Sequence, residues 1–168
     1  TSDFDGSVYF YPENGLPVSG TVWVRTANYS ISYALQSISA WVDRANDRLI
    51  GTAPPNASLT VDVAWDRQVD VQTQGSGDFV LDLSGLKDLR AYDRLTVHYL
   101  DTPGVVQSYS AYAPLVSVDI STNIVSGYYL PPQTTFRLKD SVGQIKEMKV
   151  LPSEAAYSFS LPFTAISP

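Results

Sequence analysis

The strongest constraint on the fold is a motif that occurs twice in the chain. In each copy a short apolar run is followed by a glycine, two adjacent prolines and a segment in which apolar and polar residues alternate. The glycines, Gly51 and Gly127, are 76 residues apart (127 − 51), and the first prolines, Pro54 and Pro131, are 77 apart (131 − 54). A long fixed period of this kind is typical of a tandem array, so the chain must accommodate two related structures.

The segments on either side of the motif also correspond. Residues 16–24 match residues 89–97 at an offset of 73 (89 − 16), and residues 79–83 match residues 157–161 at an offset of 78 (157 − 79). Each of these segments alternates apolar and polar residues, which is the pattern of a half-buried strand.

These matches divide the chain into three parts. Residues 1–37 correspond to the second half of a unit, 38–114 to a complete unit and 115–168 to the first part of a further unit. The incomplete units expose strand edges that must be completed, because unpaired edges promote aggregation. We expect completion within the chain, by residues outside this sequence, or by neighbouring chains.

The pattern predicts an all-β fold with essentially no helix. Short alternating runs recur between clusters of glycine, proline and serine, and no window shows a convincing helical period. About seven such strands in a period of about 76 residues fit a compact sandwich of two sheets.

Several of these motifs resemble a known family. The motifs are Asp5-Gly6 before an alternating run, Gly127 followed by the proline pair, and Phe136-Arg-Leu138-Lys-Asp140 before a glycine. Together they are similar to the bacterial immunoglobulin-like repeats of large secreted and cell-surface proteins. The resemblance implies tandem immunoglobulin-like β-sandwich units and a role in adhesion, spacing, filaments or surface layers. It implies no catalytic residue.

Composition narrows the classes of partner. The 168 residues contain no cysteine, which excludes disulfides and thiolate metal sites. The net charge of −6 disfavours nucleic acid and anionic membranes as partners. The sequence contains no run of 18 apolar residues, so it predicts no membrane-spanning helix. The sequence begins without a methionine or a leader, so we expect a processed or excised part of a longer secreted or cell-surface protein.

Calcium is the one cofactor for which the sequence offers ligands. Carboxylates near turns and predicted unit junctions are the candidates, although the full spacing of an EF-hand loop is absent. These candidate ligands are Asp3, Asp5, Asp43, Asp47 and Asp119. The alternative is that they are turn residues and solvating charges.

The sequence does not predict an enzyme. His98 is the only histidine and alternates with Leu95 and Val97, which indicates a solvent-facing strand position rather than a metal site or a catalytic triad. The only glutamates, Glu13, Glu147 and Glu154, are scattered and do not suggest the paired carboxylates of a glycoside hydrolase.

The sequence leaves two interpretations open for two of the tryptophans. Trp23 and Trp41 alternate with small apolar residues and are expected to point away from the aliphatic face. We favour packing, including packing between neighbouring units, and the alternative is a platform on which a surface glycan stacks.

We therefore predict a non-catalytic structural component of an extracellular assembly, such as a fibre, surface layer or adhesin stalk. Its partners are copies of itself or adjacent units of a longer chain, joined by strand addition. The candidate joining strand is residues 7–11, placed against residues 136–139 or 157–161 of a neighbour. The predicted interface residues are Val8, Tyr9, Phe10, Tyr11, Phe136, Leu138, Tyr157, Phe159 and Leu161. The alternative is a carbohydrate-binding module attached to a secreted enzyme.

Overall fold

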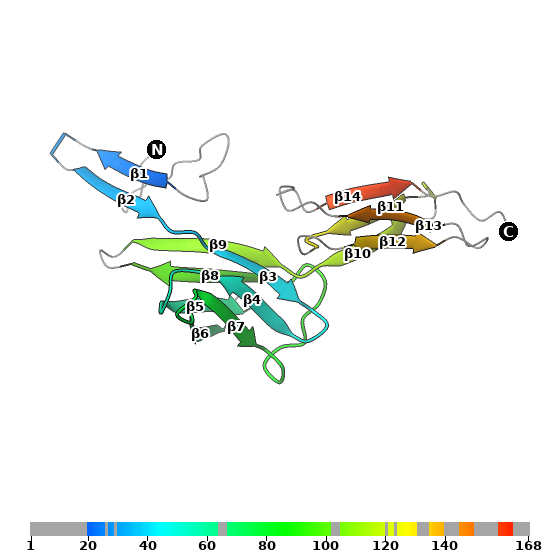
Figure 1. Ribbon diagram of the computed structural model, residues 1–168, viewed down its shortest axis with the longest axis horizontal. Helices are drawn as coiled ribbons and strands as arrows, with labels where there is room; N and C mark the ends of the chain where they lie inside the picture. The colour runs from blue at the N-terminus through cyan, green and yellow to red at the C-terminus, as the bar shows by residue number, and fades with distance from the viewer. Residues whose placement is uncertain are drawn as a thin grey trace. The chain divides into compact units, whose positions relative to one another are not determined.

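The computed structural model describes residues 20–25, 27–28, 30–63, 67–101, 105–119, 121–122, 124–130, 135–139, 145–149 and 158–162. These residues form strands β1 to β14 and no helix, which confirms the predicted all-β class (Figure 1). None of the described segments is a helix long and apolar enough to cross a membrane. The chain divides into two compact units, residues 1–37 and residues 38–168.

The first unit contains one described hairpin. Strand β1 (Gly20–Arg25) pairs antiparallel with β2 (Ser30–Leu35), and Val22 lies opposite Tyr33. Trp23 on β1 is largely exposed, and the guanidinium of Arg25 lies 5.6 Å from the centre of its ring. This contact is a cation–π interaction on an exposed face of the hairpin.

The second unit begins with seven strands in two sheets. The chain crosses between the sheets after β4, after β6 and again after β7. One sheet has the order β3 (Ser39–Asp43), β4 (Arg48–Thr52), β7 (Asp78–Asp82). The other has the order β6 (Gln68–Gln72), β5 (Ser58–Val63), β8 (Arg94–Leu100), β9 (Val106–Tyr112).

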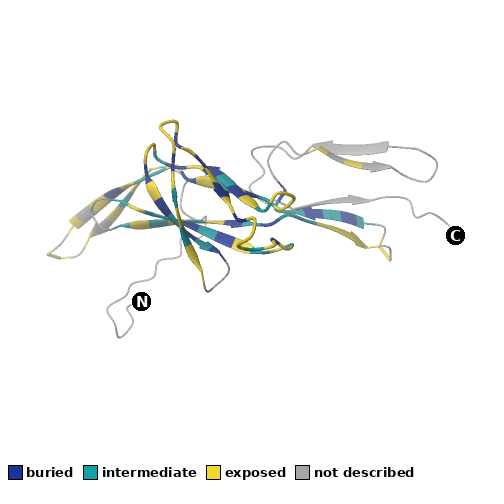
Figure 2. Ribbon diagram, turned by 90° about the horizontal axis from the view of Figure 1, so that it is seen from below, coloured by how far each residue is buried: buried dark blue, intermediate teal, exposed yellow. Residues whose placement is uncertain are grey.

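Alternation along these strands builds one core between the two sheets. On β5, Leu59, Val61 and Val63 are buried, whereas the residues between them lie on the outer side. The same alternation on the facing sheet buries Leu49 and Leu81, and all of these side chains belong to one hydrophobic cluster. Figure 2 shows the buried residues concentrated in this part of the chain. The seven strands are therefore a sandwich-like, two-layer structure.

The proline pair of the repeated motif forms the corner between the two sheets. Buried Thr73 holds this corner, because its hydroxyl donates to the carbonyl oxygen of Pro54 at 2.7 Å and accepts the N–H of Ala57 at 2.7 Å. Asn56 adopts the left-handed conformation, with φ of 56°. A rigid corner with satisfied backbone groups is what a crossover between two packed sheets requires.

The glycine of the motif makes room for an aromatic ring. Gly51 lies opposite Phe79 in the β4–β7 pair. A β-carbon on Gly51 would meet the carbonyl oxygen of Ser39 and would lie 2.7 Å from the Phe79 ring. The glycine is thus required by close packing and not by its own φ angle.

We predict that Gly51→Ala lowers the free energy of unfolding by about 1–3 kcal/mol, the usual cost of overpacking a core. Gly75→Ala is the matched control, because the nearest atom to its β-carbon, Asn56 Oδ1, is 3.9 Å away. Urea unfolding of both variants measures the difference. Equal stability of the two variants would contradict the packing role of Gly51.

The strands that follow repeat part of this pairing. Strands β10 (Leu115–Asp119), β11 (Ile124–Tyr128) and β14 (Ser158–Pro162) form a sheet in that order, as β3, β4 and β7 do. Strands β12 (Thr135–Lys139) and β13 (Ile145–Lys149) form a separate antiparallel pair.

The pairing corrects one expected offset. Gly127 lies opposite Phe159, as Gly51 lies opposite Phe79, so β14 corresponds to β7 at an offset of 80 (159 − 79) rather than 78. The segment between glycine and phenylalanine is four residues longer in the second copy, 32 (159 − 127) against 28 (79 − 51). Insertions in loops leave strand pairing intact, which explains the shift.

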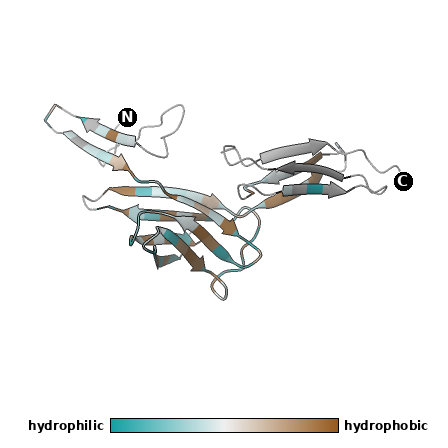
Figure 3. Cartoon of the chain, viewed as in Figure 1, coloured by the Kyte–Doolittle hydropathy of each residue, from teal (hydrophilic) through white to brown (hydrophobic). Residues whose placement is uncertain are grey.

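The two three-stranded sheets differ sharply in burial. Val42 on β3 is 2% exposed, whereas Val118, at the same place on β10, is 58% exposed. Val116 on β10 is exposed as well, and Figure 3 shows the hydrophobic character of this strand. Among the described residues, β10 therefore presents apolar side chains that β3 buries.

Candidate functional site

The outer face of the four-stranded sheet carries a continuous set of polar side chains. They lie on the outward positions of β5, β6, β8 and β9, where alternation places residues that do not enter the core. Strand register aligns them into cross-strand rows. The set comprises Ser58, Thr60, Asp62, Gln68, Asp70, Gln72, Thr96, His98, Ser108 and Ser110.

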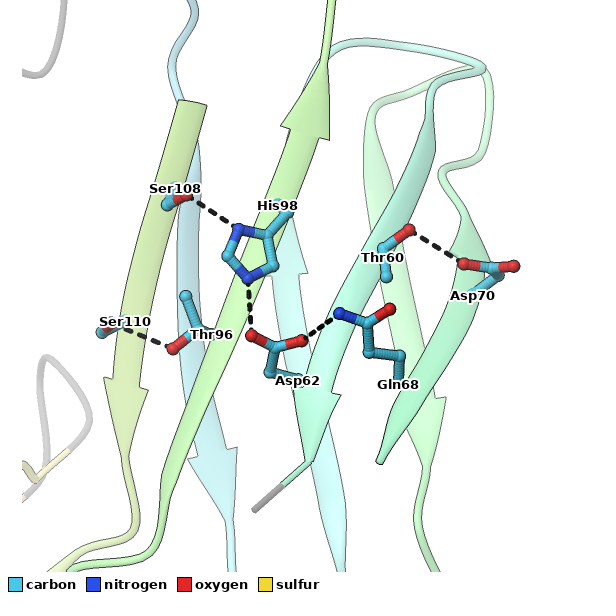
Figure 4. Close-up of polar contacts among 8 residues, drawn as sticks. All are labelled: Thr60, Asp62, Gln68, Asp70, Thr96, His98, Ser108 and Ser110. Carbon is cyan, nitrogen blue, oxygen red and sulfur yellow. Dashed lines mark hydrogen bonds and ion pairs between the residues drawn. The ribbon is translucent and has the colours of Figure 1, made fainter. Parts of the chain in front are cut away.

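His98 is at the centre of this face (Figure 4). Its Nε2 lies 2.8 Å from Asp62 Oδ2, and its Nδ1 lies 2.8 Å from the hydroxyl of Ser108. Gln68 donates to the other Asp62 oxygen at 2.9 Å. A neutral imidazole that donates from Nε2 to the carboxylate accepts the serine hydroxyl at Nδ1. His98 thus connects three strands, β5, β8 and β9.

The remaining polar groups pair in the same way. Thr60 donates to Asp70 at 2.9 Å, and Gln72 donates to Ser58 at 2.6 Å. The hydroxyls of Thr96 and Ser110 are 3.2 Å apart. Cross-strand pairs of this type stabilise a sheet by a few tenths of a kcal/mol to about 1 kcal/mol each.

The electrostatics of the face centre on Asp62. The hydrogen bond from His98 holds the pKa of Asp62 below its ordinary value of 3.8, against a smaller opposing effect of burial, with further contributions from Gln68 and Arg94. Because the pKa is lower in the folded state, ionised Asp62 stabilises the fold above about pH 3.8. That contribution is lost as the pH falls through the lower, folded-state pKa.

We predict that Asp62→Asn lowers the free energy of unfolding at about pH 6 by less than about 1 kcal/mol, because the pair is partly exposed and screened by solvent. The difference from the wild type should shrink as the pH falls below about 3.8 and Asp62 becomes protonated through its lowered pKa. Urea unfolding over a series of acidic pH values measures it. In a His98→Asn background the effect should shrink, and an undiminished effect would contradict the role of the histidine.

The order Ser108, His98, Asp62 invites comparison with a hydrolytic triad. A triad also needs donors that stabilise a negative tetrahedral intermediate beside the serine. The lining of the shallow depression on this face, about 840 Å³, includes the carboxylates of Asp62 and Asp70 but does not include Ser108. Negative charge there opposes a developing oxyanion, so the contacts support a structural role better than a catalytic one.

The signal for the Asp62–His98 pair was absent from the sequence pattern. Alternation predicted a solvent-facing position for His98, but Asp62 is 36 positions away (98 − 62), and nothing in the pattern pairs β5 with β8. Only the register of the folded sheet brings the two side chains together.

The outer face of the other sheet carries an apolar row. Trp41, Ile50 and Val80 lie opposite one another across β3, β4 and β7. Trp41 is 37% exposed and Val80 is 53% exposed. Rows of polar residues lie on both sides, including Arg48 opposite Asp82. Trp41 is therefore on the outer side of its sheet, at a position from which it can contact a partner.

The candidate calcium ligands are not brought together in the described part of the chain. Asp43 accepts a hydrogen bond from Asn46 at 2.7 Å, Asp47 accepts the N–H of Leu89 at 2.9 Å, and Asp119 accepts from the N–H of Ser121 at 2.9 Å. No group of three or more metal-ligating side chains occurs among these described residues. Asp3 and Asp5 lie outside them, so calcium stays a prediction.

The predicted interface residues are described only in part. Val8, Tyr9, Phe10, Tyr11 and Tyr157 lie outside the described residues. The backbones of Phe136 and Leu138 belong to β12, and those of Phe159 and Leu161 belong to β14. Trp23 lies on β1 and Trp41 on β3, so the two tryptophans are on different units of the chain.

A tyrosine cluster joins the seven strands to β11. The rings of Tyr112 and Tyr129 stack with their centres 4.5 Å apart. Tyr92 meets Tyr128 and Tyr129 at 6.0 Å each. Aromatic pairs at these distances contribute about 0.5–1.5 kcal/mol beyond their buried area. The cluster was not predicted, because its members come from separate turns and strands.

Comparison with known proteins adds no family. No protein-family model matches the chain, and no curated protein matches it. The interpretation of function therefore depends on strand pairing and side-chain contacts alone.

Proposed function

We propose that the chain is a non-catalytic structural component of an extracellular assembly, a fibre, surface layer or adhesin stalk. The assembly is built by packing and strand pairing of immunoglobulin-like units. The partners are copies of the chain or adjacent units of a longer one. Function of this kind needs neither a catalytic residue nor a cofactor.

The strand order supports immunoglobulin-like units. Residues 38–114 hold a three-stranded and a four-stranded sheet, and the chain crosses repeatedly between them. Two antiparallel sheets with such crossovers are the architecture of immunoglobulin-like and fibronectin-type sandwiches. The sheet β10-β11-β14 has the same order as β3-β4-β7, which supports a second, related unit in residues 115–168.

One observation carries the proposal. Val118 is 58% exposed, although the corresponding Val42 is 2% exposed in the seven-stranded part. Side chains patterned for a core and left exposed mark a surface that another element covers. An assembly in which a neighbouring chain supplies that element accounts for the pattern.

Electron microscopy of the purified chain tests this proposal. We expect linear particles that lengthen as the protein concentration rises, with a repeat equal to one chain. Separate single-chain particles at every concentration would overturn the proposal. The same images distinguish a fibre from a sheet-like surface layer.

A second candidate is a carbohydrate-binding module, favoured by the exposed Trp41 beside Ile50 and Val80. Aromatic rings on a flat face can stack on sugars. Pull-down on immobilised polysaccharides tests it with Trp41→Ala, and with Trp23→Ala for the other unit. Binding lost in either variant, with the fold intact, would establish this function, and no binding by the wild type would eliminate it.

A further inference from the structure

We propose that β1 of one copy pairs antiparallel with β12 of a second copy, so that the β1–β2 hairpin takes the place beside β12 that β8 and β9 take beside β5. This inference rests on the assembly function proposed above. It specifies the two edges that meet and the register in which they meet.

The β1–β2 hairpin corresponds to the β8–β9 hairpin. In the first, Val22 lies opposite Tyr33, and in the second, Leu95 lies opposite Ala111. The offset of 73 for β1 and β8 (95 − 22) is that of the matching sequences 16–24 and 89–97. Both hairpins are therefore the same element of a unit.

The β12–β13 pair corresponds to β5–β6. Phe136 lies opposite Met148 as Leu59 lies opposite Val71, and both strands are offset by 77 (136 − 59 and 148 − 71). The offset equals that of the proline pairs. Strand β5 pairs on its second side with β8, whereas in the described residues β12 pairs only with β13. The described residues thus place no counterpart of β8 beside β12.

The correspondence fixes the register. In the seven-stranded part, Thr60 lies opposite His98. The offset of 77 between β5 and β12 puts Arg137 at the position of Thr60. The offset of 73 between β1 and β8 puts Arg25 at the position of His98, so the proposed pairing places Arg137 opposite Arg25. Glu147 follows in the same row, because it lies opposite Arg137 on β13. The row therefore joins two basic residues with one acidic residue.

The exposed valines of β10 are an independent observation. Strand β3 packs against β9, and Val42 on β3 is buried. Strand β2 is the counterpart of β9, and β10 is the counterpart of β3. A hairpin that docks through β1 on β12 therefore also brings β2 to the face where Val116 and Val118 are exposed. One donated hairpin would then both pair with β12 and cover the exposed valines of β10.

Chain geometry favours a second copy over closure within one chain. Strands β3 and β9 run in the same direction, so the chain enters the seven strands at one end and leaves them at the other (Figure 1). Three residues, 36–38, separate β2 from β3 and span at most about 14 Å. Strand β9 alone is about 20 Å long. The link is too short to carry the hairpin past the sandwich.

Mixed single-cysteine chains test the joint, and the native chain contains no cysteine. A tagged Arg25→Cys chain is mixed with an Arg137→Cys chain under mild oxidation, and both positions are exposed. We expect a disulfide-linked heterodimer. The control partner is Glu147→Cys, one strand further away. It should give at least about tenfold less product, because a disulfide needs Cα atoms within ~7 Å.

A second pair protects the test against a misfolded variant. Trp23→Cys and Lys139→Cys occupy the row of the register that corresponds to Thr96 opposite Asp62. This pair should crosslink as the first does, and circular dichroism identifies any variant that fails to fold.

Each other outcome overturns the inference in a distinct way. Crosslinking to Glu147→Cys instead would place β1 on β13. A chain that carries both Arg25→Cys and Arg137→Cys could instead form the disulfide within a monomer. If the crosslink formed only in that way, the hairpin would close on β12 of its own chain. Assembly without either crosslink would leave the proposed function standing and refute this joint. Neither assembly nor crosslink would refute both.

Discussion

Replacing Phe79 by alanine is expected to lower the free energy of unfolding of the seven-stranded part by about 3–5 kcal/mol. Phe79 is 1% exposed, covers Gly51 and belongs to the core cluster that both sheets share. Its removal leaves a cavity in the core between the two sheets. Urea unfolding followed by tryptophan fluorescence measures the loss.

Val80→Ala is the matched control for this prediction. Val80 follows Phe79 on β7 but faces outward and is 53% exposed. Its truncation should change the stability by no more than about 0.5 kcal/mol. If the two variants lost similar stability, the shared core would not be the main source of stability.

The second large effect is expected on assembly. Val118→Asp should weaken association between copies at least about 100-fold, because a buried, unpaired carboxylate costs several kcal/mol. The stability of the single chain should hardly change, because Val118 is exposed there. Sedimentation velocity over a concentration series measures the association.

The control for Val118→Asp is Val80→Asp. Both changes place a carboxylate at an exposed valine, but Val80 lies on β7, outside the proposed joint. This variant should assemble as the wild type does. Equal weakening by both variants would mean that added negative charge, rather than the joint, limits association.

Much of the fold followed from the sequence because alternation and turns are local signals. In the alternating segment that follows the first proline pair, Leu59, Val61 and Val63 face the core, as alternation predicts. The offset of β14 was wrong by two residues, because loop length varies while the phenylalanine must stay over the glycine. Partners such as Asp62 and His98 could not be predicted, since strand pairing is not encoded locally.

The candidate surface was only partly visible from the sequence. The outward position of Trp41 follows from its alternation with Val42. The exposure of Val118 could not be predicted, because the sequences of β3 and β10 have the same pattern. A pattern indicates which side of a strand suits a core, but the neighbouring element that covers it must come from the fold or from a partner.

Light scattering of the wild-type chain over a wide concentration range tests the central claim most directly. Assembly through the hairpin predicts a weight-average mass that rises from that of one 18.4-kDa chain without stopping at a dimer, because each copy offers one hairpin and one acceptor edge. A mass that stays at one chain at all concentrations would contradict the account.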